Sequence, residues 1–216
     1  MIDKLNFLFY NMNEYEIYSL KHTKGGTIAV DKKQALKLAA HEVFSKKGYK
    51  ATGISEIAKQ ASMAVGSFYN YYDSKEAIFL DIYIDENNRA RQAMIEEIDW
   101  QMDMVELVSQ IFGRSRSLVS SNKILKEWYN PAIADELHGY YSSEEGKVSN
   151  PFHNFLVETF TSRMLAEGYS QDKIQDILRV YNLFYYMDMQ ISEQDVPELS
   201  RTLEILATNF VKGILK

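Results

Sequence analysis

The spacing of apolar residues constrains the fold of this chain more than any other feature of its sequence. From residue 31 nearly to the C-terminus, apolar side chains recur at intervals of three and four, and alternating β-branched patterns are scarce. This period of about 3.6 residues is typical of helices with one buried face. Turn-forming residues interrupt it at 150–151, 168–170 and 195–197. The sequence therefore predicts an all-α fold of about nine helices.

Capping residues mark the ends of several of these helices. Asp31 and Ser74 can cap the starts of the first and fourth helices, and Gly48 can end the first. The segment before Asp31 is rich in aromatic residues and Asn, has no clear period, and ends at Gly25-Gly26. The predicted helices span residues 32–47, 54–61, 65–71, 75–98, 103–120, 123–140, 149–167, 171–189 and 198–214.

The overall composition excludes several classes of protein. Of the 216 residues, 46% are hydrophobic and 25% are charged, which is typical of a globular chain. The chain has no Cys, and this excludes disulfides, thiolate zinc sites and Cys nucleophiles. Asp3 stands where a secretory signal would be positively charged, and the longest uncharged run, thirteen residues, is shorter than the roughly 20 that a membrane-spanning helix needs. We therefore expect a cytoplasmic protein.

Charge is distributed unevenly along the chain. A formal net charge of -6 by itself argues against a nucleic-acid partner, because phosphate binding depends on Lys and Arg. Residues 1–77, however, hold 11 Lys and Arg against 8 Asp and Glu, whereas residues 78–216 hold 13 against 22. On charge alone, the basic N-terminal part is either a surface for a polyanion or a solvated helical face.

Two short predicted helices in this basic part follow a longer one. Ala58 and Ala61 are small at the place where the helix over 54–61 has to cross the first helix closely. Ser62-Met63-Ala64 can form the turn before the next helix, with Met63 filling the gap between the two. This is the helix-turn-helix arrangement, whose second helix can enter the major groove of DNA.

Residues 32–80 also carry an ordered set of short motifs. These are Ala39-Ala40, Phe44, Lys47-Gly48-Tyr49, Thr52, Ile57-Ala58, Val65-Gly66-Ser67-Phe68-Tyr69-Asn70-Tyr71-Tyr72 and Ser74-Lys75-Glu76. In this order and spacing the segment resembles the tetracycline-repressor (TetR) family of bacterial transcriptional regulators, which usually has Gly where Ser62 stands. The resemblance implies a helix-turn-helix DNA-binding domain over 31–77 and a helical ligand-binding and dimerisation domain over 78–216. Residues 1–30 are then expected to be an N-terminal extension, either an extra arm or an upstream start outside the folded domain.

The recognition helix lacks the residues that read guanine. No Arg or Lys lies between Lys59 and Lys75, so bidentate contacts of Arg or Lys with guanine are excluded, and readout should use apolar, hydroxyl and amide contacts. Phe68 and Tyr72 fall on the inward face by their spacing, and we expect them to be core residues. The residues expected to face DNA, several of them through the resemblance, are Ser55, Ala64, Val65, Gly66, Ser67, Tyr69, Asn70, Tyr71 and Lys75, with Tyr69 and Lys75 on phosphates.

The C-terminal part carries apolar stripes that suit either a dimer interface or burial within one subunit. Helix-turn-helix proteins bind twofold operators as symmetric dimers, which favours the first. The candidate interface residues are Ile177, Tyr181, Phe184, Leu199, Leu203, Leu206 and Phe210. The candidates for an effector pocket on the middle helices are Phe112, Arg116, Trp128, Tyr129, Phe155 and Tyr186.

Other functions find weaker support in the sequence. His41-Glu42 lacks the second His of a zincin helix, because Ser45 stands in its place, and no Gly-rich phosphate loop occurs. His138, near Asp135 and Glu136, could bind a metal. We expect a homodimeric, ligand-responsive DNA-binding regulator, most simply a repressor, without enzymatic activity, metal or cofactor. The alternatives are a helical metal-binding or enzymatic bundle and a protein-interaction adaptor.

Overall fold

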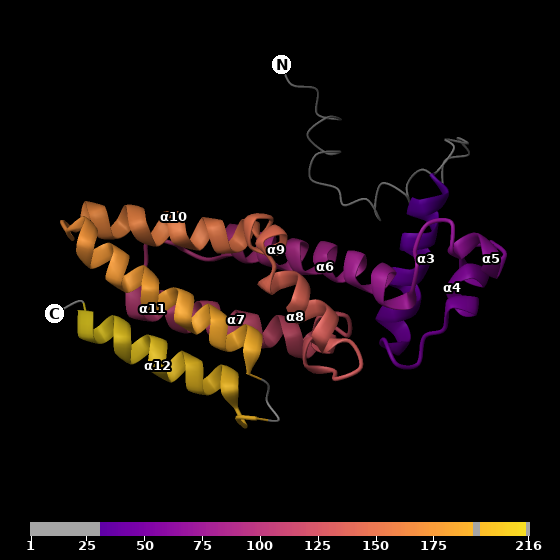
Figure 1. The fold of residues 1–216 in the computed structure, drawn as a ribbon. Helices are drawn as coiled ribbons and strands as arrows, with labels where there is room; N and C mark the ends of the chain where they lie inside the picture. Colours follow the sequence, from indigo (N-terminus) through magenta and orange to yellow (C-terminus); the bar gives the residue numbers. More distant parts are fainter. Residues whose placement is uncertain (1–30, 192–194, 215–216) are drawn as a thin grey trace, which may run out of the picture.

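The computed structural model describes residues 31–191 and 195–214. Over these residues the protein has ten α-helices, one 3-10 helix and no strand, so the prediction of an all-α fold is confirmed (Figure 1). The N-terminal extension expected over 1–30 lies outside the described residues. The elements are α3 (Lys32–Lys47), α4 (Ile54–Gln60), α5 (Val65–Phe68), α6 (Lys75–Glu97), α7 (Met104–Ser121), η1 (Leu125–Tyr129), α8 (Ala134–Ser142), α9 (Glu144–Val148), α10 (Pro151–Ala166), α11 (Gln171–Gln190) and α12 (Leu199–Ile214).

Helices α3, α4 and α5 form a small unit at one end of the molecule (Figure 1). The Asp31 carboxylate accepts a hydrogen bond from the Lys33 N–H at 3.2 Å and caps α3. Gly48 ends α3 with a φ of 78°, a left-handed conformation that glycine adopts without strain. The Ser74 hydroxyl accepts from the Ala77 N–H at 3.1 Å and caps α6. Local sequence signals thus set the ends of these helices as predicted.

Helix α6 starts at this unit and extends into the rest of the molecule, where α10 packs on it (Figure 1). The core continues through this junction. Phe79 of α6 meets Phe44 of α3 edge to face at 4.9 Å, and Tyr83 stacks on Trp128 of η1 at 5.9 Å. Both parts of the molecule therefore pack on opposite ends of one helix.

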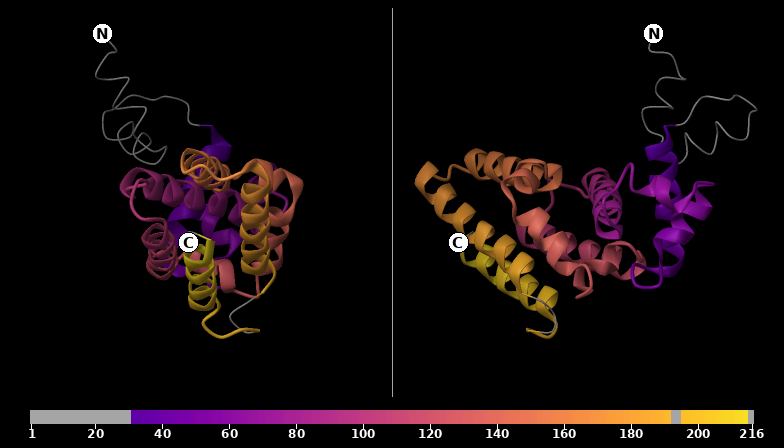
Figure 2. Two further views of the ribbon diagram at one scale, coloured as in Figure 1. Left: turned by 90° about the vertical axis from the view of Figure 1, so that its left-hand side faces the viewer. Right: turned by 45° about the vertical axis from the view of Figure 1, so that its right-hand side comes forward.

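Helices α7, α8 and α10 and the 3-10 helix η1 pack on α6, and α11 and α12 lie farther from it (Figure 2). Helix α12 packs against α7, and α11 lies between α10 and α12 with its later turns against α8. Within the described part of the chain, no helix is long and apolar enough to cross a membrane.

The predicted single helix over 123–140 is wrong. The chain forms η1, turns at Asn130, and starts α8 only at Ala134. Pro131 explains the break, because proline has no N–H to donate and disfavours helical angles at the residue before it. Asn130 accordingly has φ -82° and ψ 114°.

Candidate functional site

The helix-turn-helix surface presents most of the residues expected to face DNA. The side chain of Tyr69 is 54% exposed and that of Val65 is 45% exposed. Ser55, Ala64, Gly66 and Asn70 are also exposed, whereas Ser67, Tyr71 and Lys75 are half-buried. Helix α5 is shorter than predicted, since Asn70 and Tyr71 donate to the carbonyls three residues earlier and form a tight turn. The polar and apolar groups available for base contact therefore lie on one turn of helix and the turn after it.

Phe68 and Tyr72 hold this surface in place from the inside. Phe68 is fully buried and Tyr72 nearly so, as their spacing predicted. The Tyr72 hydroxyl donates to Asp81 at 2.6 Å, and Lys37 of α3 donates to the same carboxyl group at 2.7 Å. Burial by itself would raise the pKa of Asp81, but these two donors hold it below its ordinary value. Through Asp81 of α6, the Tyr72 side chain is thus linked to both α6 and α3.

The turn between α4 and α5 contains a residue in an unusual conformation. Ser62 has a φ of 56°, in the left-handed region where only glycine is free of strain. The Met63 N–H reaches back to the Ala58 carbonyl at 2.8 Å, and the Met63 side chain packs partly buried on the core between the two helices. The turn therefore has the helix-turn-helix geometry with a strained serine at its bend.

Lys75 supports the loop between α3 and α4. Its ammonium group donates to the Tyr49 and Thr52 carbonyls, both at 3.1 Å, and lies 4.0 Å from the centre of the Tyr49 ring. Glu127 of η1 also contacts this loop, since its carboxylate accepts a hydrogen bond from the Tyr49 N–H at 2.8 Å. The end of α3 is therefore held between α6 and η1.

Two of the cations near this surface are paired with acids of the same unit. Lys46 pairs with Glu42, and Lys47 pairs with Glu56. In the described part of the chain, exposed Lys50 and Lys59 have neither an ion pair nor a hydrogen bond. These two side chains are available for phosphates.

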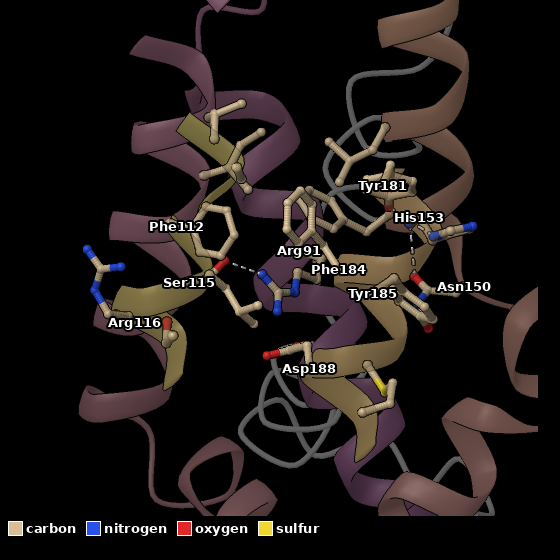
Figure 3. A pocket seen from close by; sticks show the side chains of 18 of the residues that line it. Arg91, Phe112, Ser115, Arg116, Asn150, His153, Tyr181, Phe184, Tyr185 and Asp188 are labelled. Carbon is tan, nitrogen blue, oxygen red and sulfur yellow. Dashed lines mark hydrogen bonds between the residues drawn. The ribbon is translucent and has the colours of Figure 1, made fainter. Parts of the chain in front are cut away.

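The second candidate site is a cavity of about 560 Å³ enclosed by α6, α7, η1, α10, α11 and α12 (Figure 3). Its lining is mainly apolar and aromatic, which is typical of a small-molecule site. The Tyr181 hydroxyl and His153 Nδ1 form a hydrogen bond at 2.9 Å on the α10–α11 side. Burial lowers the pKa of His153, so its imidazole is neutral near pH 7.

Four of the six predicted pocket residues line this cavity. They are Phe112, Arg116, Trp128 and Tyr129. Phe155 and Tyr186 do not. Phe155 packs edge to face on Trp100 at 4.7 Å, and Tyr186 is on the outer side of α11 with 61% of its surface exposed. An aromatic residue on these helices therefore does not by itself mark the cavity.

Most of the predicted dimer residues face the interior of the subunit. Ile177, Tyr181, Phe184 and Phe210 line the cavity, and Leu199 and Leu203 are buried. Leu206 alone among the seven is exposed. The stripe on α11 and α12 points inward because α12 packs on α7 and α11 packs on α10. The outward apolar surface of these two helices consists instead of Leu183, Tyr186, Ile205 and Leu206, which we call the outer α11–α12 face.

The residues of the cavity that the sequence did not predict include Arg91 and Asp188. Arg91 of α6 donates to the Ser115 hydroxyl at 2.7 Å, and Asp188 of α11 points its carboxyl group into the cavity (Figure 3). Burial raises the pKa of Asp188, and the charges of Arg91 and His138 oppose that shift only in part. The signal was available, because Asp188 continues the inward stripe of Tyr181 and Phe184 at helical spacing.

His138, the metal candidate, is half-buried against Trp128. The ring of His138 packs on Trp128, and its Nε2 lies 3.1 Å from the Trp128 carbonyl oxygen. Among residues 31–191 and 195–214, no group of three His, Asp or Glu side chains is arranged to hold a metal ion.

Comparison with known proteins agrees with the geometry of the N-terminal unit. Residues 38–82 match the family model of bacterial regulatory proteins, tetR family. The chain is 27% identical over 144 residues to the fatty acid metabolism regulator protein of Bacillus subtilis (strain 168), a match that covers 66% of this chain and 70% of that protein. It is 44% identical over 61 residues to the HTH-type transcriptional regulator YdgC of the same organism, covering 28% of this chain and 31% of that protein.

Solved structures of regulators are similar at greater distance. FadR from Bacillus subtilis in complex with stearoyl-CoA has a TM-score of 0.43 and 20% identity, covering 81% of this chain and 97% of that chain. Salmonella enterica GusR has a TM-score of 0.44 and 20% identity, covering 86% and 98%. Residues 38–82 therefore form a helix-turn-helix segment of the tetR family, and the curated relatives support a TetR-family transcriptional regulator.

Proposed function

We propose that this protein is a transcriptional repressor of the cytoplasm that binds a palindromic operator as a homodimer and is released by a small apolar effector. The observation that carries the proposal is the position of η1. Trp128 and Tyr129 of η1 line the cavity, while Glu127, on the same turn, holds the end of α3 through Tyr49. An effector that shifts η1 would therefore act directly on the helix-turn-helix unit.

The effector acts in this proposal by favouring one of two arrangements. If occupancy of the cavity moves η1, the Tyr49 N–H loses or changes its acceptor, and the loop between α3 and α4 shifts. The two recognition helices of a dimer must match half-sites about 34 to 36 Å apart, so a small tilt in each subunit lowers DNA affinity. One relative is named as a fatty acid metabolism regulator, and the apolar lining supports an effector with a hydrocarbon portion.

The outer α11–α12 face is the proposed dimer interface. Its four apolar side chains are 46% to 61% exposed in one subunit and lie on two neighbouring helices. Two copies that meet on this face would form an intersubunit four-helix bundle and bury the exposed apolar surface.

DNA binding is tested with the region upstream of the protein's own gene. We expect specific retardation of this DNA, with affinity at least tenfold lower for Asn70→Ala and for Tyr69→Ala, since both side chains are exposed on the recognition surface. Gln92→Ala, which removes an exposed amide on α6, is the matched control and should bind as the wild type does. Equal affinity of all four proteins would contradict the proposed DNA surface.

The dimer is tested separately by sedimentation. Leu206→Glu places a charge in the outer α11–α12 face and should yield monomers with weak operator binding, whereas Val148→Glu, at a residue of α9 that is 75% exposed, should remain dimeric. A dimer of unchanged stability in Leu206→Glu would rule out this face.

A further inference from the structure

We propose that the effector is an uncharged molecule with a hydrocarbon portion and a neighbouring hydrogen-bond acceptor and donor, as in an amide, with its acceptor toward Arg91 and its donor toward Asp188. The inference rests on the proposed function, since it names the chemical class that the cavity selects. The geometry points to this class through the carboxylate of Asp188, which has no partner among residues 31–191 and 195–214.

Asp188 is half-buried, and it is part of the cavity lining. Within the described residues its carboxylate accepts no hydrogen bond and forms no ion pair. Leaving a buried polar group unpaired costs about 1–3 kcal/mol, and more for a charged one. A bound molecule that donates a hydrogen bond to Asp188 would recover this energy.

Arg91 projects into the same part of the cavity as Asp188, and only some of the N–H donors of its guanidinium group are hydrogen-bonded. One terminal nitrogen donates to Ser115 at 2.7 Å and contacts the Met94 sulfur at 3.5 Å, and the group lies 5.1 Å from the centre of the Phe152 ring. A guanidinium carries five N–H donors in a fixed fork, so others can reach a ligand oxygen. Figure 3 shows Arg91 and Asp188 projecting into the same part of the cavity.

The charges around the cavity favour a neutral ligand. Arg116 pairs with Glu204 at 2.7 Å, a carboxylate that Arg201 shares at 2.8 Å, Lys126 is exposed, and His153 is neutral near pH 7. Arg91 and Asp188 are therefore the basic and the acidic group that the described lining leaves for a ligand, in mainly apolar surroundings. A negatively charged ligand is repelled by the carboxylate of Asp188, and a positively charged ligand is repelled by the guanidinium of Arg91. An amide can hydrogen-bond to both groups without adding charge.

The test compares four probes with closely similar hydrocarbon chains by calorimetry on the full-length protein. Decanamide offers a donor and an acceptor, methyl decanoate offers an acceptor alone, and decanoate and decylammonium carry opposite charges. We expect decanamide to bind wild type about tenfold or more tighter than each of the others, the factor that one hydrogen bond to a charged group provides.

Variants of Asp188 and Arg91 test whether these two residues cause the preference for decanamide. In Asp188→Leu the preference for decanamide over methyl decanoate should fall to about threefold or less, and decanoate should bind more tightly than it does to wild type. Decylammonium should bind Arg91→Met more tightly than it binds wild type. Asp176→Asn, which changes an exposed carboxylate on the same helix, should keep the wild-type preferences. Asp188→Leu should also raise the melting temperature, because an unpaired buried carboxylate is removed, and this shows that the variant folds.

The inference is overturned if decanoate or decylammonium binds wild type best, if none of the four probes binds, or if Asp188→Leu keeps the amide preference. Failure of the proposed function gives a different pattern. In that case decanamide binds with the expected preference while the affinity of the protein for its operator stays the same.

Discussion

The contact between Glu127 and Tyr49 offers the sharpest quantitative test of how the two parts of the molecule are joined. In Glu127→Ala the Tyr49 N–H, part of a residue that is only 3% exposed, loses the carboxylate that it contacts at 2.8 Å. A hydrogen bond to a charged group contributes about 1.5–3 kcal/mol to stability. For a chain of 216 residues this corresponds to a fall in melting temperature of about 3–12 °C.

The assay is urea and thermal unfolding at one fixed protein concentration, because the stability of the proposed dimer would depend on concentration. Glu127→Gln keeps an acceptor oxygen and loses only the charge, so it should cost about 0.5–1.5 kcal/mol. Lys126→Ala changes the exposed neighbour on η1 and should stay within about 0.5 kcal/mol of wild type. If Glu127→Ala lowered the stability no more than Lys126→Ala does, the conclusion that η1 holds the end of α3 would be refuted.

Three further substitutions test the strained turn, the helix end and the buried histidine. Ser62→Gly should stabilise the protein by up to about 1 kcal/mol in urea unfolding, because a φ of 56° strains serine. Ser67→Gly in α5 should instead lower the stability by about 0.5–1 kcal/mol. Equal changes in stability for the two variants would contradict the strain at Ser62. Gly48→Ala should destabilise by about 1–2 kcal/mol, because φ is 78° and an added Cβ would lie 2.8 Å from Glu127 Oε1; an unchanged melting temperature would count against it. Burial lowers the folded-state pKa of His153, so the unfolded chain takes up a proton first as the pH falls below about 6.5, and stability decreases until the folded pKa is passed. His153→Gln should therefore lose less stability than wild type between about pH 7.5 and 5.5, and a parallel pH profile would contradict this.

Local patterns in the sequence predicted the helix-turn-helix unit well, and their limits elsewhere have physical causes. The inward spacing of Phe68 and Tyr72 and the caps at Asp31 and Ser74 depend on neighbours along the chain, so the sequence contains them directly. The break at Pro131 was also local and was simply missed.

The cavity could not be predicted in the same way. A helical period shows that Ile177, Tyr181 and Phe184 share an inward face, but not whether that face meets another subunit, a packed core or an empty space. That outcome depends on how α7, α10 and α12 are placed in three dimensions, which the spacing within α11 does not contain. The charge at Asp188 was the available hint, since an acid on an inward stripe requires a reason.

The cavity leads to an expectation about how long the protein survives in the cell. A space of about 560 Å³ among α6, α7, α10, α11 and α12 is volume that a packed core would fill, so the empty form gives up contacts that a bound molecule supplies. Binding to the folded state alone raises stability and lowers the unfolded fraction that proteases degrade. Under the proposed function, we therefore expect the effector-bound protein to be both released from DNA and longer-lived, so that the pool of regulator is largest when the effector is withdrawn and repression has to return.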